Sequence, residues 1–253
     1  MMDVGALTSL AVIAGVASYL QTVTGFAFGL VFMGTIAATG MIGIEDGATI
    51  VSILVMVNGT QILVTNWRHV SLKSFLQIVP VALAATVAGA LLLPFLLAKS
   101  LVWLKFILGL VVIVSSLRLL HAPASAPGFP RGPAMTLSGL AGGIMGGMFA
   151  IPGPPIVYVI HRYLRTYPEI RATLVAIFST IIGFRLVFST VVASPSAGIL
   201  VPSLLLVPVA ITVTALAQLY PPPLTARMMT AITVFLLVLI GLILMLPAVA
   251  SLF

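Results

Sequence analysis

A single arginine, Arg185, lies inside the apolar run FSTIIGFRLVFS, well away from either end of that run. A charge near the centre of a bilayer costs roughly 2.5–3.5 kcal/mol to insert even on the mild translocon scale. The chain has four acidic residues, Asp3, Glu45, Asp46 and Glu169, and all four fall at segment ends or in loops. Since no carboxylate inside a span can pair with Arg185, we expect it to bind an anionic substrate. The structural alternatives are an arginine that snorkels outward or one hydrogen-bonded to backbone carbonyls.

Two amide side chains join this arginine through an internal similarity. The run ATIVSILVMVNGTQ at 48–61 aligns with ATLVAIFSTIIGFR at 172–185, which pairs Gln61 with Arg185. Asn58 lies one turn before Gln61 on the same helical face. Because amide groups donate hydrogen bonds to oxyanions, we predict that both contact the substrate. Hydrogen bonding between helices is an equally good interpretation of both residues.

Two breaks rich in glycine and proline supply the remaining candidate groups. TGFAFGL at 24–30 and IPGPPIVYVIH at 151–161 interrupt apolar segments, where lipid cannot satisfy the freed backbone groups. A short helix starting at Pro154, and an equivalent one starting at Gly29, would direct free N–H groups and a positive dipole end toward mid-membrane. The predicted substrate-binding residues are Arg185, Gln61, Asn58, Thr24, Gly25, Phe26, Ala27, Phe28, Gly29, Ile151, Pro152, Gly153, Pro154, Pro155 and Tyr158.

The composition identifies the environment in which these groups act. The chain has 253 residues, of which 61% are hydrophobic and 6% are charged, whereas a soluble domain carries about 25% charged residues. We therefore predict an all-α integral membrane protein. The net charge of +7 is not gathered into a basic run, so we expect no nucleic-acid partner. With no cysteine and three scattered histidines, we predict no metal, no cofactor and no enzymatic site.

Ten apolar segments follow one another along the chain. A complete crossing needs about 20 residues, and the sixth and seventh segments are together too short for two crossings. We expect them to form a hairpin of short or half helices that meet at the break, with the first two segments as the equivalent pair. The segments are at 5–21, 26–40, 47–65, 75–97, 101–120, 134–149, 153–164, 172–192, 199–219 and 228–247.

The internal similarity divides the chain into two halves. Five segments are an odd number, so the second half must be inverted relative to the first, and paired broken helices in inverted repeats are typical of transporters. We predict a first repeat at 1–121, a cytoplasmic linker rich in proline and alanine at 122–133, and a second, inverted repeat at 134–253.

Lysine and arginine predict the orientation in the membrane. Ten passes place eight basic residues on one face, which should be cytoplasmic, and both termini on the other. These residues are Arg68, Lys73, Arg118, Arg131, Arg162, Arg165, Arg171 and Arg227. A separate pattern, the four-residue spacing of Gly139, Gly143 and Gly147, predicts close packing of helices rather than ligand contact.

The motifs TGFAFG at 24–29 and GGIMGGMFAIPGPPIVYV at 142–159 resemble the TauE/SafE family of sulfite and organosulfonate exporters. This chain has Pro152-Gly153-Pro154-Pro155 where the family more commonly has Gly-Gly-Pro-Pro. The resemblance implies export of sulfite, sulfoacetate or a similar small anion across a bacterial inner membrane.

The sequence therefore predicts a secondary transporter that works by alternating access at a mid-membrane site. Its expected partners are the small anion and the lipid bilayer, with a homodimer left open. An anion channel or facilitator for small carboxylates or oxyanions is the alternative.

Overall fold

The computed structural model describes residues 4–120, 133–193 and 197–220, together with scattered positions between 228 and 246. In these ranges the secondary structure is helical and contains no strand. The predicted linker at 122–133 lies outside them except for Pro133, where α6 begins. The elements are α1 (Val4–Thr24), α2 (Ala27–Thr39), α3 (Ile44–Asn66), η1 (Trp67–His69), α4 (Leu72–Lys99), α5 (Leu101–Leu120), α6 (Pro133–Phe149), α7 (Gly153–Tyr163), α8 (Tyr167–Ala193) and α9 (Ala197–Leu219).

The apolar segments predicted from the sequence correspond to these nine α-helices, and the described residues between 228 and 246 are also helical. The largest difference is at α8, which begins at Tyr167 instead of 172. Its first turn contains Pro168 and Glu169, so a hydropathy pattern misses it although both residues suit a helix start.

Five helices in the described ranges are long and apolar enough to cross a membrane, which confirms an all-α membrane protein. These spans are Gly5–Thr24, Ile44–His69, Leu72–Ala98, Tyr167–Val192 and Gly198–Leu219.

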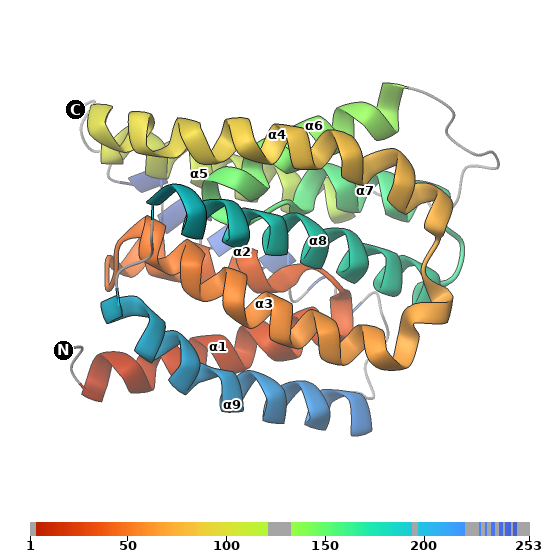
Figure 1. The fold of residues 1–253 in the computed structure, drawn as a ribbon, viewed down its shortest axis with the longest axis horizontal. Coiled ribbons are helices and arrows are strands. Elements are labelled where there is room, and N and C mark those ends of the chain that lie inside the picture. The colour runs from red at the N-terminus through yellow and green to blue at the C-terminus, as the bar shows by residue number, and fades with distance from the viewer. Residues whose placement is uncertain are drawn as a thin grey trace.

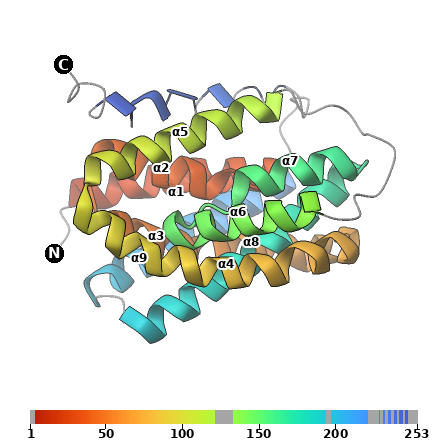
Figure 2. The ribbon, with the colours of Figure 1, turned by 90° about the horizontal axis from the view of Figure 1, so that it is seen from above.

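The helices form one bundle whose axes follow its long dimension (Figure 1). α3 contacts both α8 and α9, and α9 also contacts α1. On the other side of α8, α4 and α6 lie side by side, as Figures 1 and 2 both show. α3 and α8 are therefore the central pair, with α1 and α9 on one side and α4 and α6 on the other.

Glycines hold α6 directly against the backbone of α4. A methyl group at Gly139 would approach the carbonyl oxygen of Ile78, one at Gly143 would overlap that of Ala82, and one at Gly147 would overlap that of Thr86. The contacts advance by four residues on both helices, so the two run parallel and in register. The predicted packing role of this glycine spacing is confirmed.

Both predicted breaks contain a residue in the left-handed region of backbone space. Gly25 has φ +87° between α1 and α2, and Ala150 has φ +54° between α6 and α7. Their N–H groups still bond to the preceding turn, from Gly25 N to Gln21 O at 2.7 Å and from Ala150 N to Gly146 O at 3.0 Å. Each break thus ends one helix with a left-handed residue, a favoured stop for which only glycine is free of steric cost.

The short helices start slightly earlier than predicted. α7 begins at Gly153, and α2 begins at Ala27 rather than Gly29. The side chain of Gln21 accounts for the earlier start of α2, because its Oε1 accepts a hydrogen bond of 3.2 Å from Phe28 N. This bond satisfies one of the free donors at the helix start.

Candidate functional site

Arg185 lies on α8 and is only 5% exposed. Its Nε donates to Gly147 O at 2.9 Å, and its Nη1 donates to Ala48 O at 3.3 Å and to Ser52 Oγ at 3.2 Å. These three acceptors are neutral and belong to α6 and α3, so the arginine links α8 to both neighbours. A guanidinium carries five N–H donors, and among the described residues Nη2 is left without an acceptor.

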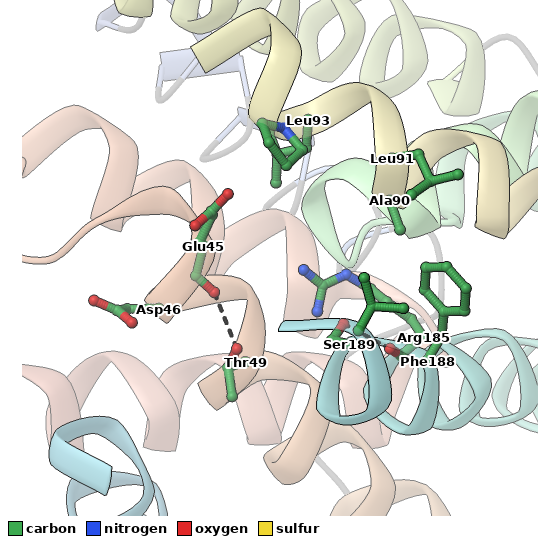
Figure 3. Close-up of a pocket in the computed structure, with 11 residues that line it drawn as sticks. Glu45, Asp46, Thr49, Ala90, Leu91, Leu93, Arg185, Phe188 and Ser189 are labelled. Carbon is green, nitrogen blue, oxygen red and sulfur yellow. Dashed lines mark hydrogen bonds between the residues drawn. The ribbon is translucent and has the colours of Figure 1, made fainter. Parts of the chain in front are cut away.

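Arg185 also forms part of the wall of a cavity between the start of α3 and the ends of α4 and α8, which we call the Arg185 cavity. In Figure 3 its guanidinium points toward the side of the cavity where Glu45 lies. Asp46 lines the same cavity, so two carboxylates share it with one cation. The other described lining residues are Thr49, Ala90, Leu91, Leu93, Pro94, Phe188, Ser189 and Val192.

Sequence reasoning had placed Glu45 and Asp46 at a segment end, away from Arg185. The structure brings all three to one cavity because α3 and α8 are antiparallel, so that the first turns of α3 lie beside the last turns of α8. The acidic residues at the start of α3 are the only sequence signal that could have suggested this, since carboxylates are favoured at a helix N-terminus.

Asn58 lies in a different region, fully buried between α1, α3 and α9. Its Nδ2 donates to Thr214 Oγ1 at 2.6 Å, Thr22 Oγ1 at 3.1 Å and Ser18 O at 3.3 Å. Its Oδ1 is buried without a partner among the described residues. Asn58 therefore bonds helices to one another in this structure, and its contact with substrate stays a prediction.

Gln61 lies 13 residues after Ala48, which is about 20 Å along α3 at 1.5 Å per residue. It lines a second cavity, the Gln61 cavity, and its Nε2 donates to Ile211 O at 3.3 Å. The structure therefore does not bring Gln61 and Arg185 together. The other described lining residues are Val64, Thr65, Asn66, Arg171, Ala215, Ala217, Gln218 and Leu219.

The described residues of the two hairpins contact each other and do not contribute to either cavity. A methyl group at Gly29 would lie 2.6 Å from Ala150 O, and one at Gly153 would lie 3.8 Å from Leu30 Cδ1. The first turns of α2 and α7 are thus side by side. Of the predicted hairpin residues whose side chains the structure describes, none lines either of these two cavities.

Two further predicted residues have partners inside the hairpins. Thr24 Oγ1 donates to Leu20 O at 2.7 Å, and Tyr158 Oη accepts a hydrogen bond of 3.1 Å from Arg162 Nη1. Each bond lies within one helix, α1 before the first break and α7 after the second, and binding of substrate by these residues stays a prediction. In the described part of the chain, no group of three or more His, Asp or Glu residues is placed to hold a metal ion.

The arrangement offers a buried cation with free donors at the wall of a cavity, which suits binding of an oxyanion. Comparison with known proteins agrees with this chemistry. The family described as "Sulfite exporter TauE/SafE" matches residues 10–247. A relative from Cupriavidus necator, described as "Probable sulfite/organosulfonate exporter TauE", is 29% identical over 245 residues, which cover 97% of this chain and 96% of the relative. No solved structure matches the chain.

Proposed function

Because this chain belongs to the sulfite exporter TauE/SafE family, we propose that it exports sulfite or a small organosulfonate across the bacterial inner membrane. The family match covers almost the whole chain, so the proposal concerns the chain as a unit. In the proposed orientation both termini are periplasmic, the Gln61 cavity faces the cytoplasm and the Arg185 cavity faces the periplasm.

The observation that carries this proposal is the position of Arg185. Its three hydrogen bonds go to uncharged groups, so its charge is oriented but not neutralised by them. A sulfite or sulfonate group presents three oxygens that can accept N–H bonds from Nη2. Charge-assisted bonds of this kind are about twice as strong as neutral ones, which makes Arg185 the proposed main ligand of the anion.

The packing of the helices supports inverted halves that alternate access. At the crossing of the two central helices, a methyl group at Gly59 would meet Ser179, and one at Gly183 would meet Met56. The internal alignment pairs Gly59 with Gly183, so each central helix presents a glycine to the other at this crossing. Likewise α6 contacts α4 as α1 contacts α9. Two similar halves with cavities at opposite ends suit exchange between inward-open and outward-open states.

The membrane potential is a sufficient driving force for the proposed export. Moving one negative charge outward is favoured by about 2.3 kcal/mol per 100 mV when the inside is negative. Glu45 and Asp46, the carboxylates of the Arg185 cavity, lie in the first turn of α3 and not at mid-membrane. We therefore propose export without an internal carboxylate that carries protons, driven by the potential or by the gradient of the anion.

Flux of radiolabelled sulfite from proteoliposomes tests the proposal. Sulfite and sulfoacetate should show saturable efflux above that of empty vesicles, should exchange with each other, and should be accelerated by a potential that is negative inside. Acetate serves as the carboxylate control. Efflux of acetate alone, or current that does not saturate with sulfite, would contradict the carrier and favour a channel or a carboxylate facilitator.

A further inference from the structure

The Gln61 cavity contains an arginine that the proposed function has not used. Arg171 comes from the second turn of α8, Gln218 from the end of α9 and Gln61 from α3. The described lining residues of this cavity include one cation and no carboxylate. It therefore differs in charge from the Arg185 cavity, where Glu45 and Asp46 oppose a single arginine.

Two hydrogen-bond donors in this cavity are buried and unsatisfied. Arg171 Nε and Gln218 Nε2 are both shielded from solvent and have no partner among the described residues. A buried donor without an acceptor costs about 1–3 kcal/mol, and more when the group is charged. Both atoms are donors, so an anion can accept from them and a cation cannot, whereas the third unpartnered atom, Gln61 Oε1, is an acceptor that a bare oxyanion leaves unpaired.

The position of Arg171 on its helix adds to this preference. A cation in the first turns of a helix is repelled by the positive end of the macrodipole, which instead favours an anion. Arg171 and the start of α8 thus both attract a negatively charged group in the cavity. Gln61 lines the same cavity, and its Nε2 is bonded to Ile211 O at 3.3 Å.

The internal similarity relates this cavity to the Arg185 cavity. A shift of 124 residues places Gln61 on Arg185 and Thr65 on Ser189, and each of these four residues lines its own cavity. The cation, however, does not follow the repeat, because Arg171 aligns with Gly47. Both cavities therefore take their cation from α8, Arg171 near its start and Arg185 toward its end, and not from equivalent positions of the repeat.

We propose that the Gln61 cavity is a second oxyanion site, in which Arg171 and Gln218 bind the transported anion when it enters from the cytoplasm. This inference rests on the proposed function, and it adds a loading site separate from Arg185. It also gives the two cavities different affinities for the anion. The Gln61 cavity, at the cytoplasmic face, attracts anions, whereas the carboxylates of the Arg185 cavity, at the periplasmic face, promote release.

Sided transport measurements test the loading site. KM for sulfite is measured at the cytoplasmic face in inside-out membrane vesicles and at the periplasmic face in right-side-out vesicles. Arg171→Gln and Gln218→Leu should each raise the cytoplasmic KM by about tenfold or more, the loss expected for one charge-assisted hydrogen bond. The periplasmic KM should change less than twofold. Arg165→Gln removes an exposed charge from the loop before α8 and should change neither constant.

The outcomes separate this inference from the proposed function. If the wild type transports sulfite and the Arg171 and Gln218 variants match Arg165→Gln, the loading site is wrong and the function stands. If the wild type shows no flux of sulfite or organosulfonate, both are overturned.

A lipid phosphate has the same oxyanion chemistry, so the measurements are repeated in purified vesicles of phosphatidylcholine with and without phosphatidylglycerol. The effect of Arg171→Gln should persist without the anionic lipid. An effect that requires phosphatidylglycerol would assign the cavity to a lipid headgroup and overturn the loading site.

Discussion

Replacement of Arg185 by glutamine should remove substrate binding at the Arg185 cavity while leaving the protein folded. Two donors on Nη2 remain for the anion after the bonds to Gly147, Ala48 and Ser52. A hydrogen bond to a charged group contributes about 1.5–3 kcal/mol, and each 1.4 kcal/mol is a factor of ten in affinity. Loss of even one such bond therefore predicts sulfite affinity weaker by about tenfold to 150-fold.

The same substitution should cost little stability. Glutamine keeps an amide donor that can serve Gly147 O, and it removes a charge that costs about 2.5–3.5 kcal/mol to insert. Arg185→Lys should bind more weakly than the wild type, because an ammonium cannot hold the two neighbouring helices and the anion with one planar fork. Ser189→Ala is the matched control: Ser189 lines the same cavity, but its Oγ bonds only to Arg185 O at 2.7 Å.

The assay is calorimetric titration of the purified protein with sulfite, together with thermal unfolding in the same detergent. We expect Ser189→Ala to bind within twofold of the wild type and Arg185→Gln to lose the binding event of the Arg185 cavity without a large shift in Tm, while binding at the Gln61 cavity persists. Equal affinity for wild type and Arg185→Gln would refute the assignment of Arg185 as a ligand. A variant that cannot be purified folded would show that its bonds to α3 and α6 dominate, and Arg185→Lys then decides the question.

The other predictions concern the packing, the breaks and the orientation. Gly143→Val should destabilise the bundle by about 1–3 kcal/mol through overlap with α4, as measured by unfolding, while Gly15→Ala, whose methyl group would make only ordinary contacts with Val209 and Val213, should not destabilise it; equal stability of the two would contradict the packing. Gly25→Ala should cost about 1–2 kcal/mol because of its positive φ, whereas Ala150→Gly should be neutral or stabilising, and the reverse order would refute the backbone assignment. Since the chain has no cysteine, Arg68→Cys should react with an impermeant maleimide only in inside-out vesicles and Gly43→Cys only in right-side-out vesicles; the opposite pattern would invert the proposed topology.

The helices and their breaks could be predicted because both depend on local sequence. The length of each apolar segment predicted the spans, and glycine and proline marked the break inside each hairpin. The early start of α2 could not be predicted, since it depends on the side chain of Gln21 reaching Phe28 N from the previous helix.

The composition of the cavities was less predictable. The internal alignment of the sequence pairs Arg185 with Gln61. It does not give the angle and register at which α3 crosses α8. That crossing decides that Glu45 lies near Arg185 and that Arg171 lies near Gln61. Glu45 and Asp46, which the sequence placed at a segment end, and Arg171, which it used only to predict the orientation, therefore line the cavities.

The contact between α4 and α6 has a mechanical consequence. Because glycines place these two backbones against each other without intervening side chains, any sliding would force carbonyl oxygens over Cα atoms, and the pair is stiff. The corresponding pair, α1 and α9, meets differently: a methyl group at Gly15 would be in ordinary contact with Val209 and Val213, each at 3.7 Å. Valine side chains on a smooth helix face permit small shear displacements. The two halves of the proposed repeat would thus be unequal in compliance, so the α1–α9 side is the one expected to move against a fixed α4–α6 frame.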